Sequence, residues 1–146
     1  YNRNGEITSQ SVSHQQEELN KFERIADQSD YRLTYIKEAI QKFTNGSNIK
    51  IVGVVGRGGI VKPLEGGTYR VNEAFLNDAR EGTYGEHASN LGCIIANKLK
   101  DEYGLEDAYT VDPVSSGNMW PKAEISGVPG IVRVTRASVK YENDCP

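Results

Sequence analysis

The sequence predicts an α/β fold, in which short apolar strands form a sheet that helices cover. Two stretches, 49–56 ("IKIVGVVG") and 107–113 ("DAYTVDP"), are short runs rich in β-branched or aromatic residues, as in buried strands. Between them, 88–103 repeats apolar residues at helical spacing. A strand, helix, strand order with apolar strands is typical of a parallel sheet flanked by helices.

The elements before the first of these strands are a short strand and a helical region. Loose alternation of β-branched residues over 5–14 predicts the strand. Apolar residues from Gln15 to Phe43 then recur at steps of three, four and seven, as in an amphipathic helix. "QSDYR" is expected to break this region into two helices, because Ser29 or Asp30 can cap the second one.

The segments after the glycine-rich stretch complete the predicted layout. "GGTYRV", 66–71, favours another short extended piece. A helix is expected to follow, with Asn72 as its N-cap and Gly82 as its stop. The helix between the two apolar strands is expected to end at Gly104. The remainder is rich in turn residues, with one strand-like piece near Ile131.

Composition narrows the classes of function. The chain has 146 residues, enough for one domain with a core, and it is 37% hydrophobic and 25% charged. Its net charge is −3, so no general basic surface predicts binding to nucleic acid or to a membrane surface. No apolar run approaches the roughly 18 residues of a membrane span. An anion site would therefore be built locally, from a few cations and backbone N–H groups.

The cysteine content and the first residues of the chain indicate the cellular location. Cys93 and Cys145 make neither a disulfide framework nor a metal site. The first ten residues carry no apolar signal region, so a cytoplasmic location is expected. Because the chain begins with Tyr1, we expect a processed, truncated or partial product.

The glycine-rich stretch "GRGG", 56–59, directly follows the first apolar strand and contains Arg57. It is not a Walker-type phosphate loop, because the chain has no Gly-Lys dipeptide. It also fails the G-x-G-x-x-G spacing, because Val61 stands at the last glycine position. Two interpretations remain equally supported, a tight turn with positive φ or an anion site around Arg57.

A second candidate lies in "GEHASNLG", 85–92, at the start of the central helix. His87 and Asn90 fall where free N–H groups and the helix dipole favour an anion. A histidine here can donate a hydrogen bond to developing negative charge. A capping or packing role is the stronger interpretation for a lone histidine in this position. His14 has no such setting and is expected at the surface, near a strand end.

A third candidate is Asp112, in "TVDPV" at the end of the second apolar strand. Its carboxylate can orient or deprotonate a nucleophile, or bind Mg²⁺ through water. An Asx-type turn is an equally supported alternative. Arg57 and Asp112 both come just after strand carboxyl ends, where ligands of α/β sheets bind. We therefore expect them to converge.

Long motifs resemble the butyrate kinases and branched-chain fatty acid kinases, members of the acetokinase family. They are "VSHQQEELNKFERIADQSDYRLTYI", "VVGRGGIVKPLEGGTYRVNEA", "GEHASNLGCIIAN", "VDPV" and "ISGVP". The likeness runs from about Val12 to about Ile131. It implies a ribonuclease H-like, actin-like ATPase domain with a mixed sheet flanked by helices. It also implies transfer of the γ-phosphoryl group of ATP to a short-chain carboxylate such as butanoate, with Mg²⁺.

The resemblance also implies roles for individual residues. Arg57 is expected to bind the carboxylate and the transferred phosphoryl group, His87 to stabilise that phosphoryl, and Asp112 to act as the catalytic aspartate and an indirect metal ligand. Phosphoryl transfer depends on positioning and charge stabilisation, which suits these side chains. Further substrate-binding positions implied by the motifs are Gly58, Gly59, Asn90 and Pro113.

The chain departs from the family pattern at both ends. Nothing matches the first strand with its Asn-Pro-Gly-Ser-Thr-Ser phosphate loop, nor the second domain that binds adenosine. Glu124, Ala137 and Ser138 replace the residues that the family pattern has there. Residues 1–146 are thus expected to form a single, incomplete N-terminal domain that is inactive alone. A non-catalytic module that binds anions or another protein is the alternative.

The missing first strand has a structural implication. In this fold it lies between the hairpin strands and the strand at 49–55, so its loss leaves two strand edges unpaired. The isolated chain is therefore expected to be marginally stable or to associate into a homo-oligomer.

Overall fold

The computed structural model describes residues 9–116, 125 and 128–129. The chain divides into two compact units, Tyr1–Lys50 and Ile51–Pro146. The strand expected near Ile131, together with Glu124, Ala137 and Ser138, lies outside the described residues. The arrangement as a single domain stays a prediction.

The first unit contains a helical region interrupted once. Its elements are α1 (Gln16–Leu19), the 3₁₀ helix η1 (Ala26–Gln28) and α2 (Ser29–Thr44). The predicted break at "QSDYR" is wrong, because Gln28 and Ser29 both have helical φ and ψ and η1 runs directly into α2. The interruption lies instead between α1 and η1. α2 has no side-chain cap, so neither Ser29 nor Asp30 caps it as expected.

An aromatic cluster in the same unit surrounds His14. The ring of His14 lies 5.3 Å from that of Tyr31 and 5.1 Å from that of Tyr35, between centroids. Tyr31 and Tyr35 are one helical turn apart, and their hydroxyl groups lie 3.2 Å from each other. This hydrogen bond is the main cause that raises the pKa of Tyr31. His14 is thus a half-buried packing residue and not the surface strand-end residue that we expected; residues 9–15 form no strand.

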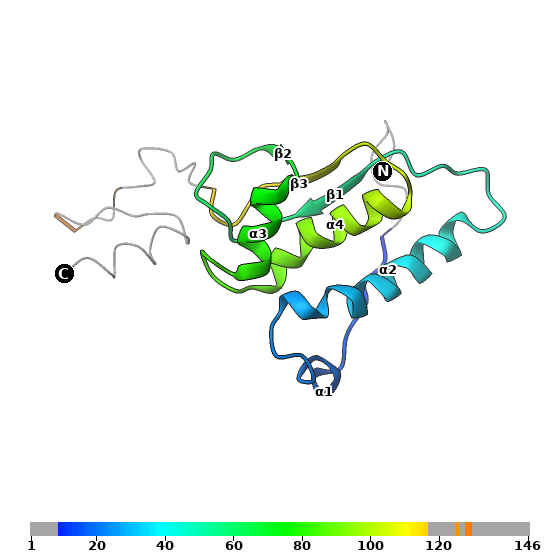
Figure 1. Ribbon diagram of the computed structural model, residues 1–146, viewed down its shortest axis with the longest axis horizontal. Helices are drawn as coiled ribbons and strands as arrows, with labels where there is room; N and C mark the ends of the chain where they lie inside the picture. Colours follow the sequence, from blue (N-terminus) through cyan, green and yellow to red (C-terminus); the bar gives the residue numbers. More distant parts are fainter. Residues whose placement is uncertain (1–8, 117–124, 126–127, 130–146) are drawn as a thin grey trace. The chain divides into compact units, whose positions relative to one another are not determined.

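The second unit is α/β, with a small mixed sheet. Its strands are β1 (Val54–Arg57), β2 (Thr68–Arg70) and β3 (Ala108–Val111), in the order β1-β3-β2. β1 and β3 are parallel, whereas β2 runs antiparallel to β3. The helices are α3 (Glu73–Glu81), the 3₁₀ helix η2 (Ala88–Asn90) and α4 (Leu91–Glu102), with α4 against β1 and β3, and α3 packed on α4 (Figure 1).

β1 is shorter and more exposed than its apolar sequence predicts. It begins at Val54 and not at Ile49, and Val52 and Val55 are 82% and 63% exposed. The prediction of a strand buried on both faces is therefore wrong. Within the described residues β1 pairs only with β3, which leaves it at one side of the sheet.

The helices of this unit begin and end as the sequence predicts. Asn72 caps α3, because its side-chain oxygen accepts a hydrogen bond from the N–H of Phe75 at 3.0 Å. Gly82 and Gly104, which follow α3 and α4, both have a φ of +62°, the left-handed conformation that ends helices. One face of α4 supplies much of the core through Leu91, Cys93, Ile94, Ile95, Ala96 and Leu99.

Two glycines let α4 approach β1 more closely than side chains would allow. A Cβ atom added to Gly92 would lie 2.6 Å from the carbonyl oxygen of Arg57 and 3.1 Å from its nitrogen. A Cβ atom on Gly56 would in turn overlap the carbonyl group of Gly92. The start of α4 is thus in backbone contact with the end of β1.

Among the described residues, none of the helices has both the length and the apolar character required to cross a bilayer.

We expect Gly92→Ala to lower the free energy of unfolding by about 1–3 kcal/mol, because the added methyl group forces α4 away from β1. Urea unfolding would measure the change. Gly53→Ala is the matched control, since a Cβ atom there meets nothing within 4 Å. Equal midpoints for the Gly92→Ala and Gly53→Ala variants would contradict the close contact.

We also expect stability to fall as the pH is lowered from about 7.5 to about 5.5. Burial, and secondarily the charge of Arg32, hold the pKa of His14 below its ordinary value of 6.5. The folded chain therefore binds this proton less tightly than the unfolded chain, and stability is lost as the pH falls through the unfolded value. The effect is small, because the ring is only half-buried.

Urea midpoints measured across this pH range would test the expectation. The His14→Phe variant should show a flatter pH dependence, because Phe keeps the aromatic packing and removes the titrating group. An unchanged slope in His14→Phe would show that another group is responsible.

Candidate functional site

The carboxyl ends of two adjacent parallel strands bring Arg57 and Asp112 together. Arg57 is the last residue of β1 and is in register with Val111, the last residue of β3. The N–H of Gly58 continues the ladder by donating to the carbonyl of Val111 at 3.0 Å. Asp112 is the next residue. The backbone pairing thus brings Arg57 and Asp112 to one edge of the sheet, as expected.

The glycine-rich stretch after Arg57 is a tight turn fixed to the exit of β3. Gly58 and Gly59 have φ values of +81° and +108°, a region that favours glycine. The carbonyl of Gly58 accepts from the hydroxyl of Thr110 at 3.2 Å, and that of Gly59 accepts from the N–H of Val114 at 2.8 Å. The tight-turn interpretation is therefore confirmed. The same turn leaves the Arg57 side chain exposed, so it remains compatible with an anion site.

Asp112 has an unusual backbone conformation. It is the one non-glycine residue with positive φ, +46°, in the described part of the chain. A residue before proline normally prefers extended backbone, so this conformation is strained. It is held by a hydrogen bond from the Asp112 N–H to the carbonyl of Gly67 at 3.0 Å and by the fully buried ring of Pro113. Strain of this kind is concentrated at functional sites.

The side chains of Arg57 and Asp112 are both exposed. Within the described residues, neither forms a hydrogen bond or an ion pair, so nothing there supports the Asx-type turn at Asp112. A guanidinium group and a carboxylate therefore lie at the same sheet edge, and the guanidinium group is the one that can bind an anion.

His87 is the N-cap of η2, as the capping interpretation predicts. Its backbone is extended, and its Nδ1 accepts a hydrogen bond from the N–H of Ser89 at 3.1 Å. The hydroxyl of Ser89 lies 2.8 Å from the same nitrogen. Capping occupies only Nδ1, so the other ring nitrogen, Nε2, is left for a ligand. His87 itself is exposed.

Asn90 holds the loops around these residues in place. It is 2% exposed, and its Oδ1 accepts from the N–H of Ile60 at 2.7 Å. Its Nδ2 donates to the carbonyl of Gly85 at 2.9 Å and lies 3.5 Å from that of Ala79. The side chain thus joins the Arg57 turn, the end of α3 and the loop before His87. Its role as a substrate ligand stays a prediction, as do those of Gly58, Gly59 and Pro113.

Ser89 is a residue that sequence reasoning missed. A Cβ atom on Gly58 would lie 3.0 Å from the Cβ atom of Ser89, so Ser89 touches the Arg57 turn as well as His87. The available signal was a serine two residues after the capping histidine, because its hydroxyl group can hydrogen-bond to the imidazole.

Two other possibilities for chemistry find no support. Burial raises the pKa of the Cys93 thiol to about 11, so it stays protonated near neutral pH. No group of three or more His, Cys, Asp or Glu side chains suited to a metal ion occurs in the described part of the chain. Asp112 would therefore have to share any cation with ligands from a substrate.

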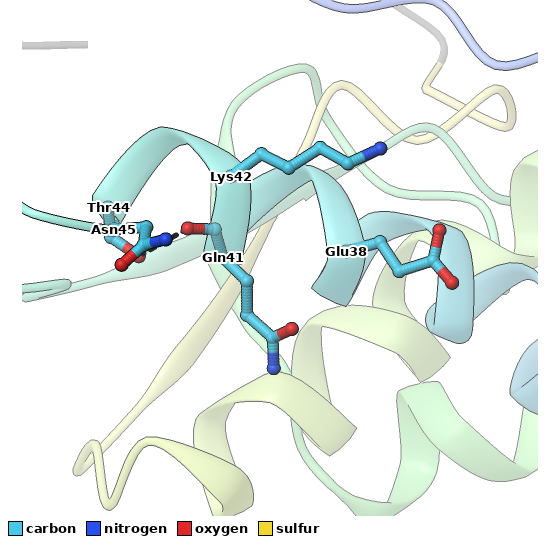
Figure 2. A pocket seen from close by; sticks show the side chains of 5 residues that line it. All are labelled: Glu38, Gln41, Lys42, Thr44 and Asn45. Atoms are coloured by element: carbon cyan, nitrogen blue, oxygen red, sulfur yellow. Dashed lines mark hydrogen bonds between the residues drawn. The ribbon is translucent and has the colours of Figure 1, made fainter.

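A surface hollow of about 510 Å³ lies elsewhere, along the last two turns of α2 (Figure 2). Its lining residues are Glu38, Gln41, Lys42, Thr44 and Asn45, all from that helix end. It contains none of the candidate residues, and a hollow lined by a single helix end supplies no converging groups. We do not assign it to the site.

Comparison with known proteins agrees with the motifs. No family model matches the chain. Butyrate kinase 2 of Clostridium acetobutylicum is 44% identical over 131 residues, which are 88% of this chain and 35% of that protein. Probable butyrate kinase 2 of Caldanaerobacter subterraneus is 40% identical over 140 residues, 94% of this chain and 38% of that protein. The chain thus spans little more than a third of the length of these relatives, and over that part its sequence is similar to butyrate kinases.

Proposed function

We propose that the edge formed by Arg57, Asp112 and His87 is the carboxylate side of a butyrate kinase active site. The reaction would be ATP plus butanoate giving ADP plus butanoyl phosphate. The observation that carries the proposal is the pairing of β1 with β3, which brings an exposed arginine and an exposed aspartate to one sheet edge. The names of the two relatives supply the substrate. We propose further that the sheet belongs to a ribonuclease H-like domain.

Arg57 would bind the substrate carboxylate. A guanidinium group presents a planar fork of donors that matches a carboxylate or a phosphoryl group. One carboxylate oxygen would attack the γ-phosphorus in line with the bond to the β-phosphate. A new O–P bond forms, the bridging P–O bond breaks, and its electron pair leaves with ADP. Such a transfer depends on positioning and on stabilising charge over the phosphoryl oxygens.

His87 would stabilise the phosphoryl group during transfer. Its Nε2 is the ring nitrogen not used for capping, so an N–H there can donate to a phosphoryl oxygen. A neutral donor adds this stabilisation without a second permanent positive charge beside Arg57.

Asp112 would hold Mg²⁺ through water, and the residues present fit that role. Mg²⁺ prefers oxygen ligands, keeps several waters and commonly takes one or two carboxylates together with substrate phosphates. The exposed carboxylate of Asp112, without a partner among the described residues, is such a ligand. Bound there with ATP, the ion would supply charge neutralisation between phosphate oxygens.

We expect butyrate to bind the chain saturably and Arg57→Gln to weaken that binding about tenfold or more, because a hydrogen bond to a charged group is lost. The amide NMR signals of Gly58 and Gly59 would follow a titration with butyrate. Arg70→Gln removes the same charge from an exposed arginine that pairs with Asp107, and it should leave binding unchanged. Equal affinities for the Arg57→Gln variant and the unchanged chain would contradict the proposal.

We further propose that the chain alone does not complete the reaction, because it spans 35–38% of the relatives it matches. Incubation with ATP, Mg²⁺, butyrate and hydroxylamine should give no acyl hydroxamate. The full-length Clostridium acetobutylicum relative is the positive control. Hydroxamate formed by the chain, and abolished by Arg57→Gln, would show instead that these residues suffice for catalysis.

A further inference from the structure

Two groups of Ser89 lie against a single atom of His87. The backbone N–H of Ser89 donates to Nδ1 of the imidazole at 3.1 Å, and the Ser89 hydroxyl oxygen is 2.8 Å from the same Nδ1. Both contacts are local, because Ser89 follows the histidine by two residues in the first turn of η2. Among the described residues, the hydrogen bonds that orient the ring both come from Ser89.

These contacts determine where the imidazole carries its hydrogen. A backbone N–H is a donor only, so a nitrogen that receives it must present a lone pair. A neutral imidazole with an unprotonated Nδ1 has its hydrogen on Nε2. The alternative, a hydrogen on Nδ1, would point at the Ser89 N–H and leave this donor of the first turn without its acceptor. The serine hydroxyl can donate to Nδ1 as well and strengthen the same arrangement.

We propose that Ser89 is a positioning residue that holds His87 as the neutral Nε2–H tautomer. In this form the nitrogen not used for capping is a hydrogen-bond donor, as a site for a phosphoryl group requires. The tautomer follows from the hydrogen bonds alone, whereas its use in phosphoryl transfer rests on the proposed function.

Ser89 also sets the spacing between His87 and the Arg57 turn. Its Cβ atom lies 3.0 Å from where a Cβ atom of Gly58 would be, and its carbonyl oxygen lies 3.8 Å from the corresponding position on Gly59. One residue thus contacts the turn that carries the arginine and fixes the ring of the histidine. The position of the hydrogen-bond donor on His87 relative to the turn after Arg57 therefore depends on Ser89.

The tautomer can be measured directly, because His14 and His87 are the two histidines of the chain. ¹⁵N NMR of the imidazole nitrogens, at a pH where both rings are neutral, distinguishes a nitrogen that carries hydrogen from one that carries a lone pair. We expect Nε2 of His87 to carry the hydrogen. In Ser89→Ala, which keeps the N–H and removes the hydroxyl, the share of the Nδ1–H tautomer should rise about two- to tenfold.

Ser89→Thr is the rescue variant, since it keeps both donors, and it should return the ring to the original tautomer. The amide signals of Leu99 and Ala108, which are buried in the same unit as Ser89, report on its folding and should not move in either variant. An Nδ1–H tautomer in the unchanged chain, or identical His87 spectra in Ser89→Ala, would overturn the proposal.

A parallel butyrate titration separates this proposal from the proposed function. If the tautomer is fixed as expected and butyrate does not bind, the function fails and the assignment of Ser89 stands. If butyrate binds in an Arg57-dependent way and the tautomer is the wrong one, the function stands and the role of Ser89 fails.

Discussion

The side-chain amide of Asn90 is the interaction on which the rest of the second unit depends. It is buried, and it hydrogen-bonds to two loops, at Ile60 and Gly85, and to the last turn of α3, at Ala79. A backbone amide or carbonyl left unsatisfied in such a place costs about 1–3 kcal/mol, so one side chain here satisfies several groups. The loops that carry Arg57 and His87 therefore have a common anchor inside the protein, while both functional side chains stay exposed.

The contact between α4 and β1 complements this anchor. Gly56 and Gly92 let two backbones meet where side chains would otherwise separate them. Because β1 pairs with β3, the position of α4 also fixes the strand end that leads to Asp112. Binding residues on loops are precise only when a rigid scaffold places them. In this unit the scaffold consists of a few short strands, one helix and the hydrogen bonds of Asn90.

Much of the second unit could be predicted from the sequence, because its signals are local. The cap at Asn72, the stops at Gly82 and Gly104, and the turn after Arg57 depend on the conformations that single residues adopt. The failures at the first apolar strand and at His14 involve residues whose surroundings come from far along the chain, whereas the failed break at "QSDYR" is a local signal that the helix overrides. Nothing in the apolar run before Val54 indicates how many strands will pair with it. Nothing in the sequence around His14 indicates that Tyr31 and Tyr35 will surround its ring. The contact of Ser89 with Gly58 joins loops 31 residues apart, which no local pattern encodes.

The backbone conformation of Asp112 costs stability, but it keeps a carboxylate at the candidate site. Glycine adopts a positive φ at little cost, whereas strain at a non-glycine residue is worth about 1–3 kcal/mol. Asp112 keeps a carboxylate where a glycine would suit the chain better, and a buried proline follows it directly. A library of variants selected for thermal stability alone would be enriched in glycine at this position. The same library selected for ligand binding would retain the aspartate, so the two selections would diverge at this residue.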